Sequence, residues 1–262
     1  MVRTGIRKPV IHTSILVSGM CAAMVVLAAW PAAAVPRESH EEKEANLRQQ
    51  AKGGLFHKWT FDADAVNALP GGFSPLSGDA ITSPPVWTVI PDATAPSAPQ
   101  VVAVTSSCEG EACFRLLVAD GLAYEYPDLS VRFRSAAGLA GVGGMAFGVK
   151  DAKNFYAALV DAEARSAQVI KMVDGVATVL GKTAVTLKAI EWHSLRVQRN
   201  TIISKDFIEA FVDGVLVLSV EDQDLGAGQV GFVTQGKTSL YFDTFHAVPL
   251  FSHRPLSAPA AY

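Results

Sequence analysis

Short runs in which hydrophobic and polar residues alternate make up most of the chain between its two ends. Successive side chains of a β-strand point to opposite faces, so a period of two predicts strands that bury one face. Glycine, proline and aspartate separate the runs, which is typical of turns. Strands are predicted over residues 55–61, 86–90, 100–105, 114–118, 128–135, 145–150, 155–161, 168–173, 176–182, 192–199, 208–212, 215–220, 230–234 and 241–248.

Two dipeptides predict how neighbouring strands are joined. Asp174-Gly175 and Asp213-Gly214 each lie between apolar runs, and Asp-Gly supplies the positive φ angles that a type I′ hairpin requires. No long helical period interrupts the strands, which favours an antiparallel sandwich or barrel over a parallel α/β sheet. Residues 69–99 are rich in proline, glycine and serine, and they predict a long surface segment with one strand inside it.

The first 34 residues have the order of a secretory signal peptide. A basic start is followed by a mostly apolar stretch at 15–29 and by small residues that offer a cleavage site after Ala34. The apolar stretch is shorter than the roughly 20 residues that a membrane span prefers. We therefore expect cleavage after Ala34 and a periplasmic or secreted protein that leaves the membrane; the alternative is an uncleaved anchor.

Three further segments are predicted after residue 34. Residues 35–53 form a charged linker or a short helix, since Ser39 and Glu42 make a capping box but the segment has almost no apolar face. Residues 54–250 form one β-sandwich domain, which is long enough to bury about 70% of its unfolded surface. Residues 251–262 hold two prolines and several small residues, which predicts a loose C-terminal tail.

The charge of the chain bears on its partners. The formal net charge is −3, and the lysines and arginines are scattered along the sequence. Proteins that bind nucleic acid gather basic residues in a patch or stripe, so nucleic acid is not an expected partner. The sequence leaves the oligomeric state open.

Two cysteines remain once Cys21 is lost with the leader. Cys108 and Cys113 flank the turn-like segment 109–112. An exported protein can keep a disulfide, and closing so short a loop is expected to stabilise the fold by about 2 kcal/mol. The alternative leaves both residues as thiols, and the C-x-x-C spacing of metal or haem motifs does not occur in the sequence.

Five phrases of the sequence carry a resemblance to a known family. They are KNFYAAL at 153–159, EWHSLRV at 191–197, FVDG at 211–214, GQVGF at 228–232 and YFDTF at 241–245. Their order and spacing resemble the concanavalin A-like lectin/glucanase superfamily, and most of all its 3-keto-disaccharide hydrolase-like and laminin-G-like modules. The resemblance covers residues 55–248 and implies an all-β fold, an antiparallel jelly-roll β-sandwich.

The sequence offers several pairs of carboxylates as candidates for catalysis. Retaining glycosidases need an acid and a nucleophile about 5 Å apart, but the E-x-D-x-E pattern of the glucanases does not occur in the sequence. Pairs two residues apart lie at predicted strand ends or turns, where acidic residues are common; they are Asp62 with Asp64, Glu109 with Glu111, Asp161 with Glu163 and Asp222 with Asp224. We therefore expect no catalytic residues, with a glycoside hydrolase as the alternative.

A binding surface follows from strand parity, because saccharide sites combine aromatic platforms with a few polar groups. Residues on the side opposite the apolar positions of strands 128–135 and 208–212 face outward, and Asn154 shares a face with Tyr156. The candidate ligand-binding residues are Arg132, Arg134, Asn154, Tyr156, Glu209 and Phe211. The alternative is that these are solvent-facing residues of a half-buried sheet.

The family resemblance also implies a structural calcium ion. Modules of this superfamily often tie their first and last strands together through an ion bound by oxygen ligands. Asp62 follows the first predicted strand and Asp243 lies in the last one. The two aspartates are therefore the candidate calcium ligands, with turn capping as the alternative, and no other cofactor is expected.

These observations lead to three hypotheses of function. The first is an exported, non-catalytic β-sandwich that binds carbohydrate or another cell-envelope ligand through one sheet face. The second is a glycoside-active hydrolase of the 3-keto-disaccharide type. The third is a laminin-G-like protein interaction module, for which a contiguous exposed apolar patch would be the distinguishing feature.

The first testable prediction concerns the leader. The exported protein is expected to begin at Val35, because residues 32–34 provide the small side chains that the peptidase accepts. N-terminal sequencing of the exported form measures this directly. Recovery of a chain that still begins with Met1 in a membrane fraction would replace the soluble form with an anchored one.

The second prediction concerns the cysteines. Cys108 and Cys113 are expected to be joined, because the exported compartment permits a disulfide and the mature chain has no other cysteine. Intact mass after alkylation, with and without a reductant, counts the alkylated thiols. Two alkylated cysteines in the unreduced protein would contradict the pairing.

Overall fold

The computed structural model describes residues 56–76, 86–107, 113–136, 141–188, 190–202 and 204–250. These residues form fifteen strands and no helix, so none of them belongs to a helix able to cross a membrane. The predicted leader, the segment 35–53 and the tail 251–262 lie outside the described residues. The strands are β1 (His57–Trp59), β2 (Phe73–Leu76), β3 (Val86–Pro91), β4 (Gln100–Ser107), β5 (Phe114–Tyr124), β6 (Pro127–Ser135), β7 (Val142–Asp151), β8 (Asn154–Asp161), β9 (Ser166–Val173), β10 (Val176–Ala184), β11 (His193–Ile202), β12 (Lys205–Val212), β13 (Val215–Glu221), β14 (Gly228–Gln235) and β15 (Lys237–Pro249).

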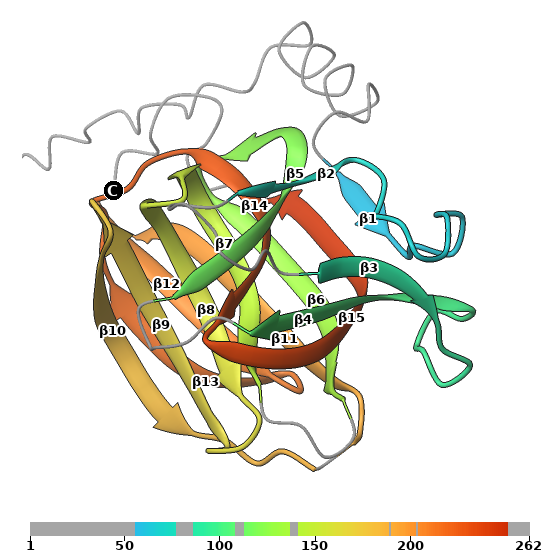
Figure 1. Ribbon diagram of the computed structural model, residues 1–262. Helices are drawn as coiled ribbons and strands as arrows, with labels where there is room; N and C mark the ends of the chain where they lie inside the picture. The colour runs from blue at the N-terminus through green and yellow to red at the C-terminus, as the bar shows by residue number, and fades with distance from the viewer. Residues whose placement is uncertain are drawn as a thin grey trace, which may run out of the picture.

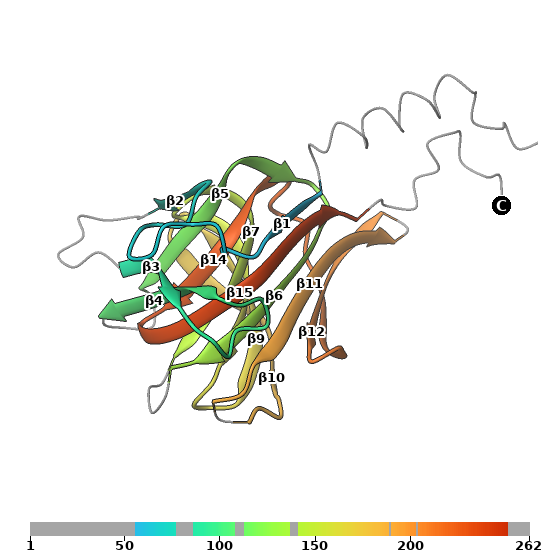
Figure 2. The ribbon, with the colours of Figure 1, turned by 90° about the vertical axis from the view of Figure 1, so that its right-hand side faces the viewer.

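The strands pair antiparallel in two sheets that form a sandwich (Figures 1 and 2). Sheet A has eight strands in the order β13-β12-β11-β6-β15-β4-β3, with β1 added beside β15. Sheet B has seven strands in the order β10-β9-β8-β7-β14-β5-β2. The expected fold class, an all-β antiparallel jelly-roll sandwich, is confirmed.

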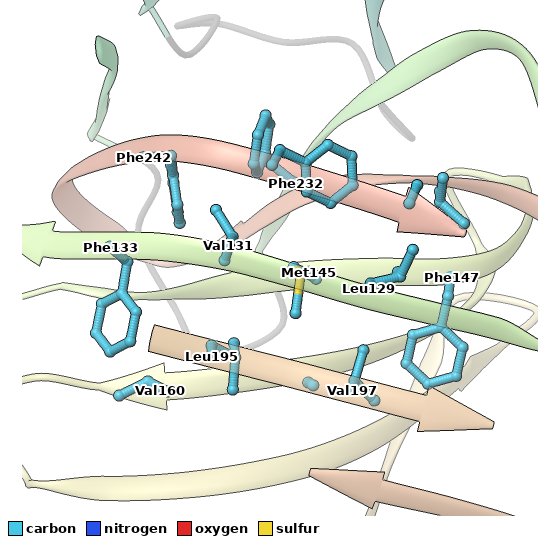
Figure 3. Packing of buried hydrophobic residues seen from close by; sticks show 14 of the residues in the cluster. Leu129, Val131, Phe133, Met145, Phe147, Val160, Leu195, Val197, Phe232 and Phe242 are labelled. Atoms are coloured by element: carbon cyan, nitrogen blue, oxygen red, sulfur yellow. The ribbon is translucent and has the colours of Figure 1, made fainter. Parts of the chain in front are cut away.

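Aromatic rings hold the two sheets together. The ring centroid of Phe232, in β14 of sheet B, lies 4.9 Å from the centroids of both Phe242 and Phe245, in β15 of sheet A. Val131 of β6 and Met145 of β7 extend the same core, and Figure 3 shows these side chains in the space between the sheets. This core fixes which side of each strand faces outward.

Sheet B is apolar on its outer face as well. Phe155, Ala157 and Leu159 of β8 belong to a second buried cluster, and each is at most 1% exposed. Tyr156 lies on the other face of the strand, fully buried and stacked on Phe147. The expectation that Tyr156 faces outward is therefore wrong. The prediction fails because β8 buries both of its faces, so the alternation of side chains cannot show which face points toward the core.

The hairpin predictions are confirmed by the backbone angles. Asp174 and Gly175 have φ angles of 49° and 79°, and Asp213 and Gly214 have φ angles of 49° and 80°. Positive values at both central positions define the type I′ turn. The first turn joins β9 to β10 and the second joins β12 to β13.

The segment 69–99 differs from its prediction. Its described residues contain two strands, β2 and β3, where one was expected. The additional strand β2 is four residues long, includes Pro75 and lies at the edge of sheet B. Proline is tolerated at a sheet edge because the missing N–H is not needed there, but it hides the strand in the sequence.

A polar network fixes the connection between β13 and β14 to the inner face of sheet B. The hydroxyl of Tyr156 donates a hydrogen bond to Asp222, whose other carboxylate oxygen lies 2.5 Å from Nζ of Lys171. The backbone N–H of Leu225 donates to the Tyr156 oxygen at 3.0 Å. Burial raises the pKa of Asp222, but hydrogen bonds from Lys171 and Tyr156 outweigh it, and the net pKa lies below 3.8.

The third prediction tests this network. Asp222→Asn should lower the free energy of unfolding at pH 7 by roughly 2–3 kcal/mol, because it removes the charged acceptor of the buried Tyr156 hydroxyl and one of the two carboxylates that pair with Lys171. The pKa of Asp222 is lowered in the folded state, so its contribution is present at neutral pH and is lost as the pH falls through that folded-state pKa. The gap between the variant and the unmodified protein should therefore close in acid. Urea denaturation of both proteins at neutral and at acid pH measures this difference in the free energy of unfolding.

The matched control is Asp224→Asn. Asp224 also pairs with Lys171, but its side chain is 64% exposed, so the loss should be less than about 1 kcal/mol. Equal destabilisation by the two variants, or a gap that does not change with pH, would contradict the assignment.

Candidate ligand-binding face

The outer face of sheet A gathers aromatic and basic side chains. Phe133 of β6 pairs in register with His193 of β11, which places Trp192 beside Arg134. Arg134 pairs in turn with Tyr241 of β15. Because Phe133 points into the core and side chains alternate along a strand, Trp192, Arg134 and Tyr241 form a row on the outer face. We call these three residues the outer row.

The guanidinium of Arg134 is held from several sides. Its Cζ atom lies 5.1 Å from the ring centroid of Trp192 and 5.2 Å from that of Tyr241, which are cation–π contacts. Its Nη2 atom lies 2.5 Å from Oδ2 of Asp92, and its Nη1 atom donates to Oγ1 of Thr94 at 2.8 Å. Asp92 and Thr94 belong to the connection between β3 and β4, so this loop fixes the outer row.

Three N–H donors on this face lack a hydrogen-bond partner. They are Nε of Arg132, Nε of Arg134 and Nε1 of Trp192, and all three atoms are buried. Nine buried side-chain atoms without a partner occur in the described residues, and these three belong to adjacent residues of one face. Buried polar groups normally have partners, and those without one call for an explanation. An ordered water or the oxygen of a bound ligand would supply the missing acceptor.

A second group of residues continues the face toward β12. Arg196 of β11 makes a two-pronged ion pair with Asp128, at 2.8 Å from Nε and 2.6 Å from Nη2. Its Cζ atom lies 5.6 Å from the ring centroid of Phe211. Glu209 lies farther along β12, where it accepts a 3.4 Å hydrogen bond from Asn200. The guanidinium of Arg196 is thus neutralised by Asp128.

The structure brings four of the six candidate ligand-binding residues to one face. Arg132, Arg134, Glu209 and Phe211 lie on the outer face of sheet A, as parity indicated. Asn154 and Tyr156 belong to β8 of sheet B and do not join them. Tyr156 lies in the core. Asn154 holds a turn, since its side chain donates to Asp151 and accepts from the N–H of Asp174.

Sequence reasoning did not select Trp192, Tyr241 or Arg196. Trp192 and Arg196 have the opposite parity to the buried Leu195, so the alternation indicates that both face outward. For Tyr241 the signal was its position between the buried residues Leu240 and Phe242. In each case the alternation was visible, but the pairing of β6 with β11 and β15 was not.

The two candidate calcium ligands meet at one residue. Asp62 accepts a hydrogen bond from the Ser97 hydroxyl at 2.8 Å, and Asp243 accepts one from the Ser97 backbone N–H at 2.6 Å. Burial raises the pKa of Asp243, and the charge of Asp62 adds to this effect. No group of three His, Cys, Asp or Glu residues that fits a metal ion occurs among the described residues. Ca²⁺ takes six to eight oxygen ligands, so two carboxylates would need backbone or water oxygens, and calcium stays a prediction.

The acidic pairs considered for catalysis have structural contacts where they are described. Asp161 accepts hydrogen bonds from the N–H groups of Glu163 and Ala164, at 3.0 and 2.8 Å. Asp222 and Asp224 both pair with Lys171. Glu109 and Glu111 lie outside the described residues. Asp161 therefore acts in a turn, and Asp222 and Asp224 act in ion pairs.

Comparisons with known proteins support the fold. No protein-family model and no curated protein matches the chain. Among solved structures, the carbohydrate binding module CBM66 from Bacillus subtilis is similar, with a TM-score of 0.52 and 18% identity over 66% of this chain and 93% of that chain. The cellulose induced protein Cip1 is similar with a TM-score of 0.50 and 11% identity, over 73% of this chain and 96% of that chain.

These likenesses concern the fold alone, because both identities are low. They agree with the concanavalin A-like resemblance at the level of a shared β-sandwich. The narrower likeness to 3-keto-disaccharide hydrolases stays a prediction.

Proposed function

We propose that this protein is a non-catalytic carbohydrate-binding β-sandwich that uses the outer face of sheet A. The observation that carries the proposal is the outer row itself, in which the rings of Trp192 and Tyr241 flank the guanidinium of Arg134 on the outer face of sheet A. The outer row comes from three strands or strand ends of the rigid sheet, so its geometry is set before a ligand arrives.

The chemistry of a saccharide fits this arrangement. A sugar ring presents C–H groups that pack on an aromatic ring and hydroxyl oxygens that accept hydrogen bonds. Hydroxyl oxygens of the same sugar can accept hydrogen bonds from the guanidinium of Arg132, which is half-buried and makes one hydrogen bond, to the backbone oxygen of Trp192. The row therefore offers both contacts within one face.

Two further observations support the proposal. One similar fold is that of a protein named as a carbohydrate binding module. The predicted leader, with cleavage after Ala34, would place the domain in the periplasm or outside the cell, where polysaccharides and other cell-envelope ligands are available.

The fourth prediction tests the outer row. Trp192→Ala in the mature protein should weaken glycan binding at least tenfold, which corresponds to about 1.4 kcal/mol, because it removes both a ring and a donor. Trp192→Phe keeps a ring and removes the donor alone, so its loss should be smaller. A glycan array identifies a ligand, and isothermal titration calorimetry measures the affinity.

The matched control is Val179→Ala, which alters an exposed apolar side chain of sheet B and should leave binding unchanged. The melting temperature of Val179→Ala should stay close to that of the unmodified protein, since surface substitutions usually change stability by less than about 0.5 kcal/mol. Melting curves of the two Trp192 variants exclude unfolding as the cause of a loss of binding. Glycan binding that is as tight in Trp192→Ala as in the unmodified protein would show that the binding site lies elsewhere. Turnover of a saccharide that is lost when one acidic residue becomes an amide would favour the hydrolase alternative.

A further inference from the structure

Three arginines lie on the outer face of sheet A, and they differ in their counter-ions. Arg134 is paired with Asp92, and Arg196 is paired with Asp128. Arg132 lies between them in β6 and forms no ion pair with any carboxylate of the described residues. Arg132 is thus the arginine of this face without a carboxylate in ion-pair contact, although its charge helps to lower the pKa of Asp213.

The guanidinium of Arg132 also has unused donors. Its one hydrogen bond goes from Nη2 to the backbone oxygen of Trp192, at 3.3 Å. Its Nε atom is buried without a partner. An arginine side chain has five N–H donors in a planar fork, so most of the donors of Arg132 are uncommitted.

The carboxylates nearest to Arg132 are held by other groups. Asp243 pairs with Arg132 in register, but its oxygens accept hydrogen bonds from the N–H groups of Ser97 and Thr244, both at 2.6 Å. Asp213 lies 2.7 Å from Nδ1 of His193 and accepts a hydrogen bond from the N–H of Ser194 at 2.8 Å. Neither carboxylate contacts the Arg132 fork.

From this arrangement we infer that the saccharide bound by the outer row is acidic, and that Arg132 receives its carboxylate or sulfate group. This inference rests on the proposed function, since it names the class of ligand for the same face. A planar guanidinium fork matches the two oxygens of a carboxylate or sulfate. An anionic ligand in contact with the fork would add the direct ion pair that Arg132 does not make with any described residue.

Position supports the same assignment. Arg132 and Arg134 are two residues apart on β6, so their side chains project from the same face. Arg132 also contacts the backbone of Trp192 directly. A sugar ring that packs on the outer row would therefore carry its charged substituent to the fork of Arg132.

The fifth prediction compares charged and neutral forms of one polymer. The mature protein should bind polygalacturonate at least tenfold more tightly than its methyl ester, or dextran sulfate at least tenfold more tightly than dextran. The first preference identifies a carboxylate and the second a sulfate. The preference should fall as the salt concentration rises, because salt screens exposed charges.

Variants of Arg132 assign the effect to one residue. Arg132→Gln should abolish the preference for the charged polymer, and Arg132→Lys should retain part of it, since lysine keeps the charge and loses the fork. Arg196→Gln is the matched control, because Arg196 is already paired with Asp128, and it should keep the preference. Melting curves of the variants exclude unfolding as the cause of a loss.

The outcomes separate this inference from the proposed function. Equal binding of charged and neutral polymers, with both lost in Trp192→Ala, would overturn the inference and leave carbohydrate binding in place. A preference that survives Arg132→Gln would also overturn it. Binding of no polysaccharide at all would overturn the proposed function together with the inference.

Discussion

The packing of the two sheets through Phe232, Phe242 and Phe245 is the interaction on which the outer face depends. Side chains alternate along a strand, so each residue fixed in this core assigns its two neighbours to the outside. Phe133 in the core places Arg132 and Arg134 outside, and Phe242 places Tyr241 beside them. A shift of one residue in β6 would turn both arginines inward, and burying unpaired charge makes such a shift unfavourable.

The accuracy of the sequence-based predictions follows the clarity of this alternation. In β6 and β12 buried and half-buried positions alternate along most of the strand, and the outward residues Arg132, Arg134, Glu209 and Phe211 were found from sequence. In β8 the residues from Phe155 to Val160 are all apolar and all buried. Such a strand has two apolar faces, so parity alone gave Tyr156 the wrong side.

The sequence patterns did not show which strands that are distant in sequence pair with each other. The hairpins at Asp174 and Asp213 are local, and their angles were predictable from two residues. The outer row instead depends on β6 lying between β11 and β15, and no local pattern specifies which strands are neighbours. The loop that holds Arg134 through Asp92 and Thr94 was likewise beyond prediction, because its contact is between side chains far apart in sequence.

Rigidity and charge have separate roles on this face. Arg134 is fixed by two rings and by Asp92, so it costs little further side-chain entropy when a ligand binds. Arg196 is neutralised by Asp128 in the same way. Because both of these arginines are already matched, they contribute shape and hydrogen-bond donors more than net charge. Selectivity between ligands of similar shape then falls on Arg132, whose fork makes one hydrogen bond and no direct ion pair with a described residue. An anionic ligand gains an ion pair there that a neutral ligand does not.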